Sequence, residues 1–185
     1  MLVLASNSPR RKEILTAAGI PFVVRIPSTI ELIAPGEAPA AYVQRLAEEK
    51  ALSVPLSPGE VILGADTTVV VDQHILEKPL DAADARRMLS LLSGREHQVL
   101  TGICLRSETR KIVDLATTRV RFVQLSDAEL DAYVDSGEPM DKAGAYAIQG
   151  RASKFIDLVD GCYFNVVGLP IALVYRHLKN LTVSL

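Results

Sequence analysis

Two serines and two arginines near the N-terminus form the first group of residues that could do chemistry. They lie in SNSPRR, residues 6–11, between an apolar strand and a helix that Pro9 opens. Free N–H groups at a helix start attract anions, and a guanidinium matches two phosphate oxygens. Two arginines in a first turn oppose the helix dipole. The sequence therefore favours a phosphate site at Ser6, Arg10 and Arg11, the alternative being two solvated arginines.

A carboxylate forms the second candidate. Asp66 ends an apolar strand that begins at Val61, and strand ends in α/β sheets commonly open into ligand crevices. We interpret Asp66 as a candidate base or metal ligand, with Thr67 beside it as a ligand contact or as part of the strand. The alternative, equally favoured by position alone, is that Asp66 caps a turn or accepts backbone N–H bonds.

Two lysines extend the basic set. Lys50 falls on the apolar stripe of a helix expected over residues 38–54, and Lys78 follows a short strand. Because an unpaired buried ammonium is costly, Lys50 either contacts a phosphate or extends its ammonium to the surface. Glu31 and Gln149 lie in expected loops and are weaker candidates on their own.

The residue types together suit a polyphosphate substrate that arrives with a hard divalent cation, since Mg²⁺ binds through one or two carboxylates plus substrate phosphates. The chain has no GxxxxGK[ST], kinase-type GxGxxG or GxSxG motif. His74, His97 and His177 are scattered and receive no role. Cys104 and Cys162 lie far apart without a CxxC, so neither a disulfide nor a zinc site is predicted.

The elements that must position these residues alternate between strands and helices. Strands are expected over residues 2–5, 22–25, 61–65 with a β-branched continuation over 67–71, 97–105, 112–124 and 155–159. Helices are expected after Ser8, over 38–54, after Asp81, after Ser126 and from Pro170. This pattern predicts an α/β protein with a mixed, elongated central sheet flanked by helices. We expect one domain over residues 1–185, whose long strands allow two lobes with a cleft between them.

Composition excludes several classes of protein. The 185 residues are 49% hydrophobic and 23% charged, which disfavours disordered, collagen-like and coiled-coil chains. With 20 basic and 22 acidic residues the net charge is −2, so no global basic field exists to hold nucleic acid. The longest uncharged stretch, residues 161–175, is too short to span a bilayer, and the N-terminus does not read as a signal peptide. We expect a cytoplasmic protein that binds neither nucleic acid nor membrane.

Six blocks of sequence occur in order along nearly the whole chain. They are SNSPRR at 6–11, GADT at 64–67, EKP at 77–79, LSGR to VLTG at 92–102, GEPMDKAGAYAIQG at 137–150 and NVVGLP at 165–170. One block alone would be a weak signal, but the ordered set closely resembles the Maf family of nucleotide pyrophosphatases.

The resemblance implies a reaction and a fold. The reaction is hydrolysis of a nucleoside triphosphate to the monophosphate and pyrophosphate with a divalent metal cation, Mg²⁺ or Mn²⁺. The fold is the Maf and inosine triphosphatase-like α/β fold, in a cytoplasmic homodimer. The GADT form is similar to the branch that acts on dTTP and UTP, because a branch that acts on methylated GTP carries glutamine where this chain has Thr67. Modified pyrimidine triphosphates are further substrates that the resemblance allows.

The resemblance also assigns residues. It gives catalytic positions to Asp66, Glu31, Lys50 and Lys78. It gives substrate-binding positions to Ser6, Arg10, Arg11, Thr67 and Gln149. Arg11, Thr67 and Gln149 match positions linked to substrate choice in the family. Asp66 and Glu31 are the candidate metal ligands, and the sequence leaves open whether Asp66 acts as base or ligand. Relatives often carry two acidic residues where this chain has Ile30 and Glu31.

A function from a different class stays open. Maf relatives have been linked to septum formation, so the alternative is a nucleotide-binding regulator of cell division or stress with little catalysis. The intact Asp66 and the full basic set favour an enzyme, because a sensor could lose the aspartate and still bind nucleotide.

Overall fold

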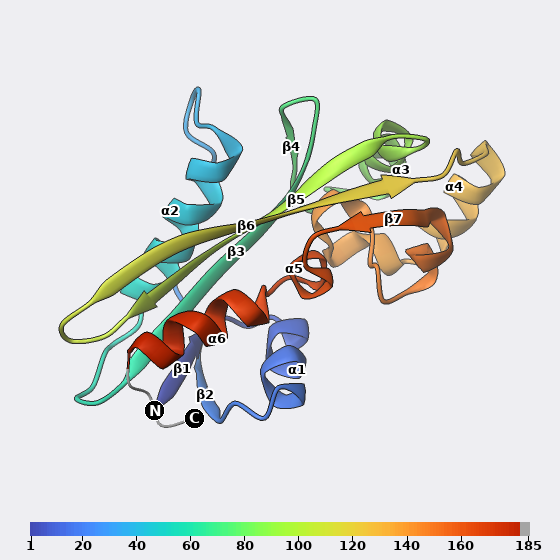
Figure 1. Cartoon of the computed structure of the whole chain (residues 1–185). Helices are drawn as coiled ribbons and strands as arrows, with labels where there is room; N and C mark the ends of the chain where they lie inside the picture. Colours follow the sequence, from blue (N-terminus) through green and yellow to red (C-terminus); the bar gives the residue numbers. More distant parts are fainter. Residues whose placement is uncertain (182–185) are drawn as a thin grey trace. The chain divides into compact units, whose positions relative to one another are not determined.

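The computed structural model describes residues 1–181, which contain a mixed sheet of seven strands with helices along it (Figure 1). The strands are β1 (Leu2–Ala5), β2 (Phe22–Arg25), β3 (Val61–Val71), β4 (His74–Leu76), β5 (Glu96–Arg106), β6 (Lys111–Phe122) and β7 (Ile156–Asp160). Their order is β2-β1-β3-β5-β6-β7, with β4 paired to β3. β1 runs parallel to β2 and β3, whereas β4 and β7 are antiparallel to β3 and β6. The predicted mixed sheet is therefore confirmed.

Three of the helices in residues 1–181 begin where side-chain caps predict. They are α1 (Pro9–Ala17), α2 (Pro39–Leu52), α3 (Ala82–Leu92), α4 (Asp127–Asp135), α5 (Tyr163–Val167) and α6 (Ile171–Asn180), with 3₁₀ turns η1 (Glu138–Asp141), η2 (Ala143–Ala145) and η3 (Arg151–Phe155). Ser8 and Asp81 accept backbone N–H bonds at the starts of α1 and α3, and Ser126 and Glu129 form a capping box on α4. Within residues 1–181 no helix has the length and apolar character needed to cross a membrane.

The described chain divides into two compact units. Unit 1 contains residues 1–67, 101–116 and the segment from Gly168 onward, and unit 2 contains residues 68–100 and 117–167. Three of the four boundaries between segments fall inside strands, because β3, β5 and β6 each contribute residues to both units. Each unit is described by itself below.

In unit 1, α2 lies directly against the sheet. A Cβ on Gly64 of β3 would lie 2.1 Å from the carbonyl oxygen of Ala47, and one on Gly102 of β5 would lie 2.3 Å from that of Val43. Both glycines therefore allow the α2 backbone to approach the strands closely. The predicted apolar stripe of this helix is confirmed, since Val43, Leu46, Ala47, Ala51 and Val54 are all buried. This close approach brings the side chain of Lys50 to β3.

Unit 2 has an aromatic core that includes a histidine. His97 packs edge-on against Phe122 and Tyr146, with ring centroids 5.3 and 5.4 Å away. Its Nε2 lies 2.9 Å from the hydroxyl of Tyr146, and Nδ1 is buried without a hydrogen-bond partner in the described chain. Burial lowers the pKa of His97 to about 4. His97, to which the sequence assigns no chemical role, is a neutral core residue.

We expect His97 to make unfolding easier in acid. Its pKa is about 4 in the folded protein and 6.5 as an ordinary value, so the unfolded chain takes up the proton first as pH falls. The stability that the neutral ring contributes is present above pH 6.5 and is lost progressively toward pH 4. Between pH 7 and 5 the free energy of unfolding should fall by about 2 kcal/mol through this residue.

Urea unfolding followed by circular dichroism at pH 7 and pH 5 measures this loss. His97→Gln, which carries no titrating ring, is the control and should show a shallower fall with pH. Equal falls in the two proteins would contradict the assignment.

Candidate functional site

Asp66 lies in the middle of β3 in unit 1. The prediction that a strand ends at this residue was wrong, because the β-branched residues that follow continue the same strand without a break to Val71. The side chain is buried, with 5% of the residue exposed. Oδ1 accepts a hydrogen bond from Lys50 Nζ at 2.6 Å, and Oδ2 has no hydrogen-bond partner among the described residues. The alternative of a turn cap is therefore contradicted.

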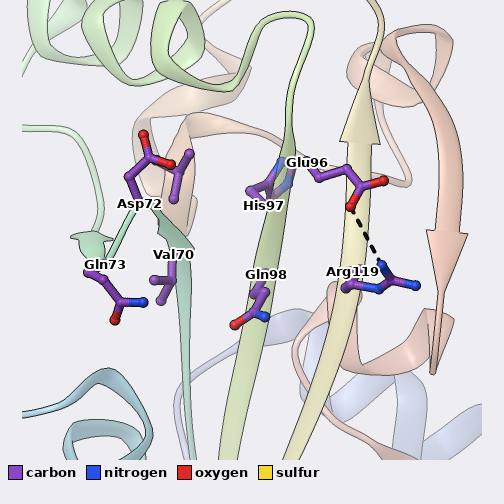
Figure 2. Close-up of a pocket in the computed structure, with 8 residues that line it drawn as sticks. Val70, Asp72, Gln73, Glu96, His97, Gln98 and Arg119 are labelled. Atoms are coloured by element: carbon purple, nitrogen blue, oxygen red, sulfur yellow. Dashed lines mark ion pairs between the residues drawn. The ribbon is translucent and has the colours of Figure 1, made fainter.

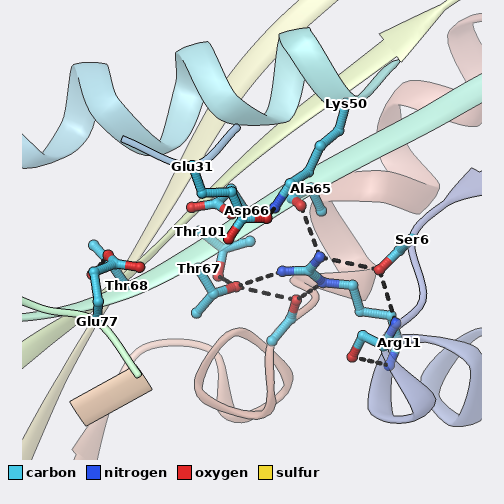
Figure 3. A network of polar contacts seen from close by, with 12 residues as sticks. Ser6, Arg11, Glu31, Lys50, Ala65, Asp66, Thr67, Thr68, Glu77 and Thr101 are labelled. Carbon is cyan, nitrogen blue, oxygen red and sulfur yellow. Dashed lines mark hydrogen bonds and ion pairs between the residues drawn. The ribbon is translucent and has the colours of Figure 1, made fainter. Parts of the chain in front are cut away.

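Lys50 stands between two carboxylates. Its ammonium lies 2.6 Å from Asp66 Oδ1 and 2.6 Å from Glu31 Oε1 (Figure 3). The residue is only 7% exposed, so the alternative in which it extends to the surface is wrong. Glu31 comes from the loop before α2, and 41% of its side chain is exposed. The three charges form a compact cluster with one buried and one half-exposed carboxylate on a single ammonium.

Arg11 is buried in α1 and bonded to neutral acceptors. Its Nε donates to the carbonyl of Gly168 (2.9 Å) and its Nη1 to the carbonyl of Ala65 (2.7 Å) and to Ser6 Oγ (3.3 Å). Its Nη2 donates to Thr67 Oγ1 (3.1 Å), as Figure 3 shows. Four of its five N–H donors thus have acceptors in the described chain. This guanidinium ties α1 to β3 on both sides of Asp66.

Burial is the largest influence on the pKa of Arg11. Removal from water lowers the pKa of the Arg11 guanidinium below its ordinary value, and the nearby carboxylates of Asp66 and Glu31 oppose that shift. The positive charge of Arg11 is thus balanced by the charges of the Lys50 cluster, and no carboxylate is hydrogen-bonded to it directly in the contacts described above.

Thr67 belongs to the same buried network. Its Oγ1 accepts from Arg11 and lies 2.9 Å from Thr101 Oγ1 and 3.3 Å from the carbonyl oxygen of Gly168. A hydroxyl has one donor and two acceptor positions, and these three contacts can occupy all of them. The Thr67 hydroxyl therefore has no position left for a further hydrogen bond, and its bond from Arg11 helps to fix the Arg11 guanidinium.

Ser6 and Arg10 complete the N-terminal segment. Ser6 is 4% exposed, and its Oγ accepts from the Ser8 N–H at 3.1 Å. Ser8 Oγ in turn caps α1 by accepting from the Arg11 N–H. Arg10 is half-buried in the first turn of α1, which contains no acidic residue. The predicted set of two hydroxyls and two guanidiniums is therefore gathered at this helix start.

The nine predicted site residues divide between the units. Unit 1 holds Ser6, Arg10, Arg11, Glu31, Lys50, Asp66 and Thr67, and the contacts above bring six of these into hydrogen-bonded or ion-paired networks. Lys78 and Gln149 are exposed residues of unit 2. Close to Lys78 along the chain, buried Thr68 donates to Glu77 Oε1 at 2.8 Å.

Sequence reasoning missed three participants, Thr101, Gly168 and the carbonyl of Ala65. All three lie in the family-like blocks GADT, VLTG and NVVGLP, and these blocks are the only sequence signal for them. A single threonine or a backbone carbonyl does not identify a functional site from sequence, because the same groups occur throughout sheets and turns.

Unit 2 also carries a hollow of about 290 Å³, shown in Figure 2. It is lined by Val70, Val71, Asp72, Gln73, Glu96, His97, Gln98 and Arg119. Its charged groups are paired, Glu96 with Arg119 at 3.6 Å and Asp72 with Arg95. It contains none of the predicted site residues. No cluster of three or more His, Cys, Asp or Glu side chains that could hold a metal occurs within residues 1–181.

Comparison with known proteins decides the family. A family model described as Maf-like protein matches residues 1–181. The chain belongs to the Maf family. A Maf relative from Koribacter versatilis, named dTTP/UTP pyrophosphatase, is 51% identical over 179 residues, covering 96% of this chain and 93% of the relative. One from Bacillus pumilus with the same name is 47% identical over 184 residues, covering 99% and 97%.

Solved structures show the fold of this Maf chain. A HAM1 protein from Coxiella burnetii has a TM-score of 0.53 at 15% identity, covering 97% of this chain and 98% of that one. The Ham1 protein from Staphylococcus aureus has a TM-score of 0.51 at 12% identity, covering 98% and 99%. At such identity the likeness concerns the fold alone, and it confirms the predicted α/β class.

Proposed function

We propose that this Maf chain is a nucleoside triphosphate pyrophosphatase that hydrolyses dTTP and UTP to the monophosphate and pyrophosphate. The observation that carries the proposal is Asp66, a buried carboxylate with one oxygen held by Lys50 and the other without a partner in the described chain. The relatives named dTTP/UTP pyrophosphatase, about half identical over almost the whole chain, support the choice of substrate.

In this proposal Asp66 is the base that takes a proton from the water attacking the α-phosphorus. The bond from Lys50 Nζ to Oδ1 fixes the orientation of the carboxylate, so that Oδ2 is left to accept a proton. Water forms a new P–O bond at the α-phosphorus, its proton passes to Asp66, and the bond to pyrophosphate breaks. The basic residues stabilise charge on the phosphate oxygens.

A divalent cation fits the two carboxylates of the cluster. Mg²⁺ prefers oxygen ligands and often uses one or two carboxylates plus the substrate's phosphates, which agrees with a site that has few protein ligands. As the alternative to the base role of Asp66, we propose Asp66 and Glu31 as those ligands. Asp66 Oδ2 is a buried oxygen without a hydrogen-bond partner in residues 1–181, and Glu31 is paired with the same Lys50 ammonium. When bound, the cation would neutralise phosphate charge and polarise the phosphoryl oxygen.

Substrate choice through Arg11, Thr67 and Gln149 stays a prediction. For the first two, the contacts support an indirect role, since both side chains are engaged by protein groups around Asp66. Replacing Thr67 by a longer side chain would displace the Arg11 guanidinium and thereby change the space beside β3. The homodimer and the cytoplasmic location also stay predictions.

Pyrophosphate release from dTTP, UTP, CTP, GTP and methylated GTP with Mg²⁺ or Mn²⁺ tests the function. Release confined to dTTP and UTP is the expected result, and modified pyrimidine triphosphates form a second panel. No release from any nucleotide, with binding still detectable by calorimetry, would support the alternative of a nucleotide-binding regulator of cell division or stress.

Arg10→Ala and Lys78→Ala should each lower kcat/KM for dTTP by about 100-fold while leaving the melting temperature within a few degrees. Substitution of exposed or half-buried side chains changes stability by only about 0.5 kcal/mol, whereas loss of a cation that stabilises phosphate charge costs about 3 kcal/mol of transition-state binding. Lys12→Ala, on the same helix as Arg10, is the matched control. Unchanged kinetics with a lowered melting temperature would show a purely structural role.

A further inference from the structure

A tight turn in unit 2 presents Gln149. The N–H of Gly150 donates to the carbonyl of Ala147 at 3.0 Å and closes the turn over residues 147–150. Gln149 is exposed at the third position of this turn. One internal hydrogen bond is a weak restraint, because each ordered backbone residue costs about 1–2 kcal/mol of conformational entropy. The position of the turn must therefore come from outside it.

Two side chains hold the turn on both flanks. Tyr133 of α4 donates its hydroxyl hydrogen to Glu138 Oε1 at 2.8 Å and accepts the N–H of Ala147 at 3.2 Å. The carboxylate of Glu138 accepts the N–H of Arg151, with 3.0 Å to Oε1 and 3.2 Å to Oε2. The residue at the start of the turn and the one just after its end are thus tied to the same pair of side chains.

The pair is itself firmly placed. Tyr133 is only 3% exposed and packs edge-on against Phe155 at 5.6 Å between ring centroids. Burial raises the pKa of the Tyr133 phenol, so the hydroxyl stays a donor to Glu138. A Cβ on Gly150 would lie 2.2 Å from Glu138 Oε1, which means that the turn backbone lies directly on the carboxylate. A side chain at position 150 would therefore have to displace the Glu138 carboxylate.

We propose that Tyr133 and Glu138 are positioning residues that set the turn over 147–150, and with it the amide of Gln149, for the nucleoside part of a pyrimidine triphosphate. This inference rests on the proposed function. An amide both donates and accepts hydrogen bonds, so it can match a base or a sugar hydroxyl only from a defined position. The pair acts on the geometry of the turn and does not touch the reacting phosphate.

Three variants test the role of the pair. Tyr133→Phe removes only the hydroxyl, and Glu138→Ala removes the carboxylate. Glu138→Gln keeps an acceptor oxygen and is the conservative variant expected to rescue. Glu129→Ala is the matched control, because it removes the capping box and weakens α4 without a contact to the turn in the described hydrogen bonds.

Two readouts separate positioning from general loss of stability. Amide hydrogen exchange at Ala147 and Arg151 should become at least about tenfold faster in Tyr133→Phe and Glu138→Ala, because each loses an acceptor for one of those amides. KM for dTTP and UTP should rise about tenfold with kcat within about twofold, and Glu138→Gln should lie near the wild type. Glu129→Ala should change neither exchange at these amides nor KM.

Faster exchange with an unchanged KM would overturn the proposal, as would unchanged exchange in both variants. If the proposed pyrophosphatase function itself is wrong, the result is distinguishable, because the wild type would then hydrolyse neither dTTP nor UTP. In that case dissociation constants for dTTP and UTP from calorimetry replace KM in the same comparison, and values equal to those of the wild type would overturn the positioning role.

Discussion

Asp66→Asn should lower kcat for dTTP and UTP by about 1000-fold or more while the nucleotides still bind. Asparagine keeps the size of the side chain and, through its Oδ1, the bond from Lys50. Its amide group then takes the place of the buried Oδ2, where it donates instead of accepting and takes up no proton. Loss of a general base alone costs about 10²–10⁴ in rate.

Pyrophosphate release and calorimetric nucleotide binding measure the two parts of this expectation. Asp72→Asn, which alters the exposed aspartate in the turn after the same strand, is the control and should hydrolyse normally. Near-normal hydrolysis by Asp66→Asn would contradict the assignment. Titration with Mg²⁺ separates the two roles of Asp66, because activity that recovers at high metal identifies a ligand and activity that stays low identifies the base.

Lys50→Met should lower the free energy of unfolding by about 3–5 kcal/mol, since breaking a buried ion pair leaves an uncompensated charge. The ammonium lies 2.6 Å from both Asp66 and Glu31, and 7% of the residue is exposed. Methionine fills similar space with an apolar chain, so the loss comes from the charge left on Asp66. Activity should fall as well, because the carboxylate loses the contact that orients it.

The double variant Lys50→Met with Asp66→Asn provides the decisive comparison. Removing both charges should restore most of the lost stability, which a double-mutant cycle in urea expresses as a coupling free energy. Glu48→Gln, on the same helix and paired at the surface with Lys111, is the control and should cost little. Additive losses in the cycle would show that the Lys50 contact contributes nothing to folding.

Local signals predicted most of the elements. The caps at Ser8, Asp81 and Ser126 and the apolar stripe of α2 act within a few residues of chain, so their types and spacing suffice. α5 has only five residues, too few to show a helical period. The sequence places Asp66 at the end of an apolar strand, whereas the structure continues the strand through it. A buried carboxylate is costly without a partner, and no residue close to Asp66 in the sequence indicates that Lys50 supplies one.

The sequence indicates which residues are candidates for the site, but it does not indicate which residues contact one another. Residue type and local position single out Arg11 and Asp66 in the sequence, although Asp66 lies in the middle of β3 and not at its end. Their partners come from distant segments. Thr101 is 34 residues from Thr67, and Gly168 is 157 residues from Arg11. Such pairings depend on sheet order, which single-chain patterns do not encode.

The Arg11 network also has a consequence for synthesis of the chain. Its first acceptors, Ser6, Ala65 and Thr67, leave the ribosome in the first part of translation, but the carbonyl that receives Nε belongs to Gly168. In a nascent chain the Nε donor of Arg11 therefore lacks its native acceptor until synthesis has passed residue 168. A protein truncated before this glycine should lack the acceptor for Arg11 Nε, and with it the hydrogen bond that joins α1 to the segment beginning at Gly168.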